Sequence, residues 1–283
     1  MMRIRLGQNN YGKSRVRMLR LSRQERHHEI KELTLEILFE GDFDRVHTEG
    51  DNAKILPTDT IKNTVYVLAK QYPPEPMEEF AEHLIEHFLT YNPQVSRVKI
   101  ACSEHPWNRI TVGDKPHATS FIRAGNETRT AVVTGTREET RFAAGIHDLA
   151  IMKTAGSAFE GFVRDPYTSL KSTMDRILMT NVRAEWHYAA EEVAFSPIWH
   201  GVRQTLLETF AGHDSRSVQH TLYAMGEAVL KSFEPISEIR LAMPNKHYNL
   251  ADLTPFGMEN ENEIFVPTDE PHGMIEATLR KDV

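Results

Sequence analysis

The stretch HEIKELTLEILFE, residues 28–40, decides the class of fold. Apolar side chains occupy alternate positions in its second half, namely Leu33, Leu35, Ile37 and Phe39. Polar side chains occupy most of the positions between them, namely Glu32, Thr34, Glu36 and Glu40. Because successive side chains of a strand point to opposite faces of its sheet, this period of two predicts a β-strand with one buried and one wet face. Such half-solvated strands are typical of antiparallel sheets.

The segments around this strand extend the pattern. Residues 15–21 alternate in the same way and predict a preceding strand. Thr58 and Asp59 are two candidate N-caps for a helix that ends near Lys70. A second helix is expected over residues 77–91, where one apolar stripe is formed by Phe80, Leu84, Phe88 and Tyr91. Two further strands are expected, over residues 98–102 and 118–133.

The second half of the chain repeats this order. A helix is expected with Ser196 as its cap and Pro197 at its first position, ending at Gly212, and another from about Ser215. Strands are expected over residues 141–153, 182–188, 239–243, 263–266 and 275–279. Both halves thus read strand, strand, helix, helix, strand, strand. We therefore expect an α+β protein of two domains, residues 1–138 and 139–283, each with helices on one face of an antiparallel sheet.

The composition narrows the class of function. The chain has 283 residues, 40% of them hydrophobic, which is enough for one large or two ordinary domains. Its net charge of -7 argues against nucleic acid or an acidic membrane as the main partner. No apolar run approaches the about 18 residues of a membrane span. The single cysteine, Cys102, predicts neither an intrachain disulfide nor a multi-cysteine metal site, and a cytoplasmic location is expected.

The chemistry is expected in residues 153–176, KTAGSAFEGFVRDPYTSLKSTMDR. Phe159 and Phe162 lie among small residues, so a ring here can stand clear of the backbone as a stacking platform. Arg176 carries a planar guanidinium that can hold an oxygen-bearing edge through two parallel hydrogen bonds. Together they predict a planar, anionic, heteroaromatic ligand. The plainer alternatives are a core phenylalanine and a surface ion pair between Arg176 and Asp175.

Five segments carry a family resemblance. Ser157-x-Phe159-x-x-Phe162, continued through Arg176 to Leu178, is similar to the signature of urate oxidase, or uricase. The other four are residues 8–13, 58–64, 218–219 and 241–247. They occur in the family's order, at close to its spacing, over nearly the whole chain. The chain therefore resembles the uricase family, although Pro57 and Glu160 depart from the residues familiar at those positions.

The resemblance implies a fold, an assembly and a reaction. The fold is two tandem tunnelling-fold (T-fold) domains of ββααββ order, and the assembly is a homotetramer whose sheets close into a barrel around a tunnel. Each site is formed where the first domain of one subunit meets the second domain of its neighbour. The reaction oxidises urate with dioxygen and water to 5-hydroxyisourate and hydrogen peroxide, with no metal and no organic cofactor. Members from eukaryotes usually end in Ser-Lys-Leu; this chain ends Lys281-Asp282-Val283, so a bacterial protein is expected.

The resemblance also assigns the residues that move protons. Lys13 and Thr58 form a proton-shuttling pair, and His247 completes the relay. A partly desolvated lysine can act as a base, and an imidazole can carry a proton near neutral pH. The alternatives are one more cation in a basic stretch for Lys13, a helix cap for Thr58 and an ordinary strand histidine for His247.

The remaining assignments concern urate and oxygen. Arg176 takes the carbonyl and deprotonated nitrogen edge of urate, and the amide of Gln219 takes the opposite edge. Asn245, with Thr58, holds dioxygen or water above the ligand plane, although an asparagine after Pro244 is also a common turn residue. The other predicted contacts are stacking by Phe159, packing by Leu170 and the backbone of Asp59 and Val218.

Three rival interpretations remain. His83-Leu84-Ile85-Glu86-His87 matches H-x-x-E-H, so His83 and His87 could bind zinc with Glu86 as the base of a hydrolase. No third ligand is obvious, however, and both histidines fall at the rim of an apolar stripe. The second rival is another tunnelling-fold enzyme acting on a purine or pterin. The third is a purine-binding or scaffold protein without catalysis, which would not need the relay of Lys13, Thr58 and His247.

Overall fold

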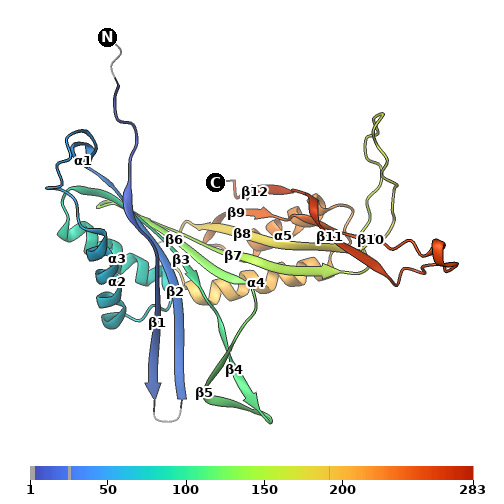
Figure 1. Ribbon diagram of the computed structural model, residues 1–283, viewed down its shortest axis with the longest axis horizontal. Helices are drawn as coiled ribbons and strands as arrows, with labels where there is room; N and C mark the ends of the chain where they lie inside the picture. The colour runs from blue at the N-terminus through green and yellow to red at the C-terminus, as the bar shows by residue number, and fades with distance from the viewer. Residues whose placement is uncertain (1–3, 25–26, 191, 283) are drawn as a thin grey trace. The chain divides into compact units, whose positions relative to one another are not determined.

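The computed structural model describes residues 4–24, 27–190 and 192–282. The chain divides into two compact units, Met1–Ala144 and Gly145–Val283. Each unit contains an antiparallel sheet and two long helices, so the predicted α+β class is confirmed (Figure 1). The division falls within one long strand, β7 (Thr140–Lys153), whereas the sequence-based boundary after residue 138 precedes it. Within the described residues, no helix combines the length and apolar character that a membrane span needs.

The first unit is a sheet with two helices on one face. The strands lie in the order β1 (Tyr11–Gln24), β2 (His27–Gly41), β3 (Val95–Glu104) and β6 (Thr128–Gly135), all antiparallel. Helices α2 (Thr58–Gln71) and α3 (Met77–Tyr91) pack against this sheet. The predicted alternation of β2 is confirmed, because Leu33, Leu35, Ile37 and Phe39 are all fully buried. The stripe of α3 meets them, with the rings of Phe39 and Phe88 in edge contact at 4.9 Å, but its predicted last member, Tyr91, is 72% exposed.

Two parts of the first unit differ from the prediction. A short helix, α1 (Asp44–Thr48), was not anticipated. The single strand expected over residues 118–133 is wrong: the chain forms a two-stranded hairpin, β4 (Trp107–Val112) and β5 (Lys115–Arg123), before β6 begins. The indole of Trp107 at the start of this hairpin donates a 2.8 Å hydrogen bond to Glu32. Glu32 is consequently only 8% exposed, so the wet face predicted for β2 is covered at this position.

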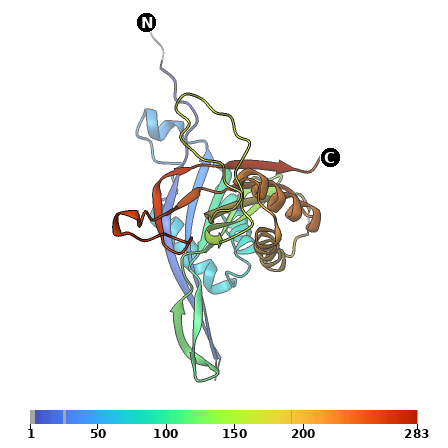
Figure 2. The ribbon, with the colours of Figure 1, turned by 90° about the vertical axis from the view of Figure 1, so that its right-hand side faces the viewer.

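The second unit also combines an antiparallel sheet with two long helices, but the strands at the edges of its sheet are paired differently. Its strands are β7, β8 (Leu178–Tyr188), β9 (Ile236–Ala242), β10 (Asn245–Leu250), β11 (Phe265–Gly273) and β12 (Glu276–Arg280). Strand β8 pairs with both β9 and β10, β9 pairs with β12, and β10 pairs with β11. Helices α4 (Phe195–Gly212) and α5 (Val218–Ser232) lie side by side, and α5 packs on β9 and β12 (Figure 2). A 3-10 turn, η1 (Thr254–Phe256), lies between β10 and β11.

The observed N-termini of the helices differ from several predictions. Helix α2 begins at Thr58 behind Pro57, with no side-chain cap, so neither Thr58 nor Asp59 is the N-cap. Helix α4 begins at Phe195, one residue before the predicted cap Ser196. Helix α5 is capped by Ser217, whose hydroxyl accepts the backbone N–H of His220 at 3.1 Å. The hydroxyl of Thr58 is therefore not committed to capping its own helix.

Candidate active site

In the second unit, the loop between β7 and β8 is tied to the start of α5. This β7–β8 loop, residues 154–177, is the yellow-green excursion between the two strands in Figure 1. Ala158 donates its N–H to the carbonyl of Ser215 at 2.7 Å, and Ser215 donates to Gly156 at 2.9 Å. Ser157 donates its N–H to the Asp175 carboxylate at 3.1 Å. These bonds hold the segments of Phe159, Arg176 and Gln219 against one another.

Arg176 and Phe159 lie next to each other in this loop. The guanidinium carbon of Arg176 is 5.1 Å from the centre of the Phe159 ring. Both side chains are half-buried, and the buried Nε of Arg176 has no hydrogen-bond partner among the described residues. Burial lowers the pKa of the Arg176 guanidinium, which nevertheless remains charged at neutral pH. A buried charged donor without an acceptor is costly, so this group is suited to an anionic, oxygen-bearing ligand.

The start of α5 offers backbone and amide groups to the same place. Val218 is the first helical residue and is 2% exposed, and Gln219 follows it with an exposed side chain. The first N–H groups of a helix have no partner within that helix. The Ser217 hydroxyl accepts from the N–H of His220, and among the described residues the N–H of Val218 has no hydrogen-bond acceptor. This N–H is therefore available for a ligand, as is the amide of Gln219.

Asn245 and His247 lie on β10, a strand that the sequence did not predict. Lys246 between them pairs with Met179 of β8, which begins just after Arg176. The register of β10 against β11 shifts between Asn245, opposite Gly273, and His247, opposite Thr268. Asn245 is thus the first residue of a strand and not a free turn residue. Leu170 is 53% exposed on the β7–β8 loop, where its carbonyl accepts from Arg164 at 3.2 Å.

In the first unit, β1 and the approach to α2 are held together near Lys13. A Cβ at Gly12 would lie 1.8 Å from the carbonyl oxygen of Ile37, so only glycine permits this pairing of β1 with β2. The register of that pairing shifts directly after Lys13. The hydroxyl of Tyr11 accepts the N–H of Leu56 at 2.9 Å, which fixes the segment leading to Thr58 against β1.

Thr58 and Asp59 are exposed as the first two residues of α2. The Asp59 carboxylate accepts from the ammonium of Lys62 at 2.5 Å and from the amide of Asn63 at 3.0 Å. The hydrogen bond from Lys62 lowers the pKa of Asp59, and the charge of Lys13 lowers it further. Lys13 therefore lies near this helix start, whose N–H groups and dipole favour an anion.

The zinc interpretation of α3 is not supported. The ring of His83 stacks on Tyr72 at 4.3 Å, whereas that of His87 contacts Tyr91 at 4.8 Å. Glu86 is exposed. Over the part of the chain that the structure describes, no three His, Cys, Asp or Glu side chains gather where they could hold a metal ion.

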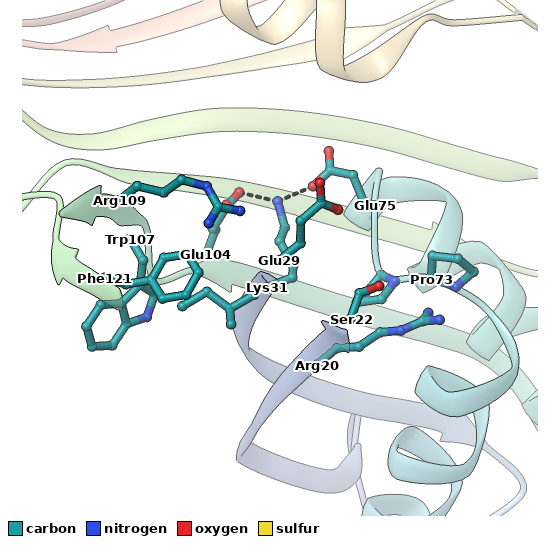
Figure 3. A pocket seen from close by; sticks show the side chains of 12 residues that line it. Arg20, Ser22, Glu29, Lys31, Pro73, Glu75, Glu104, Trp107, Arg109 and Phe121 are labelled. Atoms are coloured by element: carbon teal, nitrogen blue, oxygen red, sulfur yellow. Dashed lines mark ion pairs between the residues drawn. The ribbon is translucent and has the colours of Figure 1, made fainter. Parts of the chain in front are cut away.

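A cavity of about 540 Å³ in the first unit contains none of the predicted site residues (Figure 3). It lies between the β1–β2 and β4–β5 hairpins and the segment after α2, with Trp107 and Phe121 on one wall. The ammonium of Lys31 on its floor is paired with both Glu75 and Glu104. The positive charge of Lys31 at the centre of this cavity is thus already balanced by carboxylates of the first unit.

Comparison with known proteins covers both units. A family model described as Uricase matches residues 9–134 and 142–276. The chain is 43% identical over 277 residues to the uricase of Arthrobacter globiformis, covering 98% of this chain and 90% of that relative. It is 38% identical over 277 residues to the uricase of Dictyostelium discoideum, covering 96% of each. The crystal structure of the Arthrobacter globiformis uricase superposes with a TM-score of 0.94 at 42% identity, over 99% of this chain and 96% of that one.

Proposed function

Because the chain belongs to the uricase family, we propose that it is a urate oxidase, an enzyme of purine catabolism. It combines urate, dioxygen and water to give 5-hydroxyisourate and hydrogen peroxide. One carbon–oxygen bond is formed at the purine, and dioxygen accepts the two electrons and two protons that leave. The observation that carries the proposal in this molecule is Arg176, a half-buried cation next to an aromatic ring with a buried Nε awaiting an acceptor.

The residues that bind urate belong to the second unit. Phe159 stacks on the urate plane, and Leu170 packs beside it. Arg176 holds the carbonyl and deprotonated nitrogen edge, where its fork matches two adjacent acceptors. Gln219 binds the opposite edge through its amide, and Val218 donates its backbone N–H.

The proton-transfer role falls to Lys13, Thr58 and His247. Removing a second proton from urate raises the electron density of the purine, so that it can reduce dioxygen directly. Lys13 accepts the proton through the Thr58 hydroxyl, which is free because it does not cap α2. His247 passes protons onward, and Asn245 with Thr58 positions the oxygen species. The N–H of Asp59, second in α2, donates to the ligand.

The site is proposed to lie between subunits of a homotetramer of tunnelling-fold domains, residues 1–138 and 139–283. Lys13, Thr58 and Asp59 come from one subunit, and the groups of the second unit come from its neighbour. Three exposed apolar side chains on the β7–β8 loop support such a contact, because apolar surface gathered on one segment often marks an interface. Val163 is 91% exposed, Tyr167 is 92% exposed and Met174 is 72% exposed.

A single assay tests the reaction and its independence from cofactors. The protein is stripped with a chelator, and the loss of the ultraviolet absorption of urate is followed together with peroxide release. We expect full activity, with one peroxide formed per urate consumed, because the urate dianion itself supplies the electrons. Activity that disappears with the chelator and returns with one metal ion would overturn the cofactor-free mechanism. If neither the stripped nor the metal-loaded protein consumes urate, the proposed urate oxidase activity itself is wrong.

Mixed assemblies test the shared site. Lys13→Ala and Arg176→Ala subunits, each expected to have little activity alone at a urate concentration below the KM of Arg176→Ala, are unfolded and reassembled together. If every site takes Lys13 from one subunit and Arg176 from its neighbour, random mixing leaves both intact in about a quarter of the sites. Recovery of roughly that share of parent activity is expected. A mixture as inactive as its components would place both residues in the same subunit.

A further inference from the structure

The β7–β8 loop contains two stacked rings, Phe159 and Phe162, of which only Phe159 has been assigned a role. The rings of Phe159 and Phe162 are nearly parallel, at 11° and 5.0 Å between centres. The guanidinium carbon of Arg164 is 4.9 Å from the centre of the Phe162 ring. The guanidinium carbon of Arg176 is 5.1 Å from the centre of the Phe159 ring, so each ring has one arginine next to it. Offset parallel rings and cations over ring faces are both attractive arrangements.

We propose that Phe162 is a positioning residue for urate, which fixes the plane of the Phe159 ring by stacking on it. The inference rests on the proposed function and goes beyond it, because Phe162 would act through Phe159 without touching urate. With Phe162 against it, Phe159 has one face already covered and its ring plane set before urate arrives. A stacking ring whose orientation is fixed beforehand loses less conformational entropy when the ligand binds.

The backbone explains how two rings three residues apart in a loop come to stack. Gly161 between them has φ +70, in the left-handed region that favours glycine. This conformation turns the chain back, so that Phe162 lies on Phe159 and does not extend away from it. Phe159 and Thr173 exchange two backbone hydrogen bonds, of 2.8 and 3.0 Å, which close the base of the turn.

Arg164 supports the outer end of the stack. Its guanidinium covers Phe162 and donates to the carbonyl of Leu170 at 3.2 Å, linking the stack to another predicted urate contact. The turn after it is held by Asp165, whose carboxylate accepts from Tyr167 N–H at 2.9 Å and from the Thr168 hydroxyl at 2.8 Å. The loop therefore holds both rings in place: Phe159 through its hydrogen bonds with Thr173, and Phe162 through Arg164.

Three substitutions at Phe162 test the inference, with anaerobic urate binding and steady-state turnover as separate measurements. Without dioxygen, urate binds but is not consumed, so Kd is measured apart from chemistry. We expect Phe162→Ala to raise Kd and KM roughly three- to tenfold, the range of an aromatic pair, with kcat changed by less than about twofold. Phe162→Tyr keeps the stack and should remain within about twofold of the parent. Phe162→Leu keeps most of the volume without the ring and should resemble Phe162→Ala.

The controls separate this inference from the proposed function. Phe256→Ala removes a 73% exposed ring from η1, outside the stack, and should leave urate binding unchanged. Parent-like Kd in Phe162→Ala, or equal losses in the Tyr and Ala variants, would overturn the positioning role while urate oxidation by the parent stands. If Phe162→Ala fails to assemble, Phe162→Leu decides, since parent-like Kd there overturns the role of the ring. A parent protein that binds no urate would defeat the proposed function instead.

Discussion

The starts of α2 and α5 differ in how the chain holds the groups that it presents there. Thr58 and Asp59 begin α2 behind Pro57, exposed and without a side-chain cap. At α5, Ser217 caps the helix, Val218 is 2% exposed, and backbone hydrogen bonds join this helix start to the β7–β8 loop. The α2 start leaves a hydroxyl free to exchange protons. The α5 start holds its donors in fixed positions, as a binding site requires.

The two cations of the proposed site differ in the same way, one being partly buried and the other lying near an exposed helix start. Arg176 is half-buried beside a ring, and its buried Nε lacks a partner among the described residues. Lys13 lies at an irregularity of β1, near the exposed carboxylate of Asp59. A desolvated fork contributes to binding, whereas an ammonium close to an exposed helix start can take part in proton transfer. Substitutions in the two places should therefore affect different kinetic constants.

The largest effect is expected for Lys13→Ala. Because loss of a general base typically costs about 10²–10⁴-fold in rate, kcat should fall by this factor while anaerobic urate Kd stays nearly unchanged. Stopped-flow turnover and anaerobic titration measure the two quantities separately. Lys54→Ala is the matched control, since Lys54 is a half-exposed lysine paired with Asp42. A Kd for Lys13→Ala that rises as much as kcat falls would remove the distinction between the two regions.

Arg176→Ala should have the opposite signature. Removing the buried partner of an anionic ligand costs about 2–5 kcal/mol of binding free energy, so Kd and KM for urate should rise by well over tenfold. The decline in kcat should be smaller than for Lys13→Ala, measured at saturating urate. Arg280→Ala, which removes an exposed cation paired with Glu238, is the control. Unchanged urate affinity in Arg176→Ala would place the binding edge elsewhere.

The fold was largely predictable where side-chain periodicity is set by burial. The alternation of β2 and the stripe of α3 follow directly from apolar spacing, because both elements bury one face in the same core. The hairpin β4–β5 escaped prediction because it is a two-stranded sheet whose residues are mostly exposed or half-buried, so burial imposes little pattern on it. The cap predictions at Thr58 and Ser196 failed by one residue or two. The N-cap is decided by where the backbone leaves helical geometry, and a proline or alanine can occupy it.

The candidate site was predictable as a set of residues but not as an arrangement. The segment of residues 153–176 itself placed Phe159 and Arg176 in one predicted site, whereas Gln219 joined them only through the family resemblance. The hydrogen bonds between residues 156–158 and Ser215, which join their segments, are backbone contacts without a sequence signal. The sequence offered Phe162 as a second candidate ring but did not predict that it stacks on Phe159, because a spacing of three residues has no fixed meaning in a loop. Only the left-handed conformation of Gly161 brings its ring onto Phe159, and a glycine between two phenylalanines was the available clue.

Val218→Pro tests the fixed backbone donor at α5. Proline is well tolerated at the first helical position, and the extended conformation of Ser217 suits the residue before a proline. The substitution therefore removes one N–H without breaking the helix. A hydrogen bond to a charged group contributes about 1.5–3 kcal/mol, so anaerobic urate Kd should rise roughly tenfold or more. Val218→Ala, which keeps the N–H, controls for the lost side chain, and equal Kd values in the two variants would exclude the backbone contact.

Asp59→Ala should have the smallest effect, because the role proposed at this position belongs to the backbone N–H. The side chain is 70% exposed and is engaged by Lys62 and Asn63. Its loss should change urate Kd and kcat by no more than about twofold, as is usual for exposed positions. The hydrogen bond from Lys62 holds the pKa of Asp59 below its ordinary value of 3.8, so this carboxylate stays ionised above that pH. The pH–rate profile of Asp59→Ala between pH 5 and pH 9 should therefore overlay that of the parent, measured as kcat and kcat/KM. A displaced profile would mean that the carboxylate tunes the charge of Lys13, and the start of α2 would then be as tightly organised as that of α5.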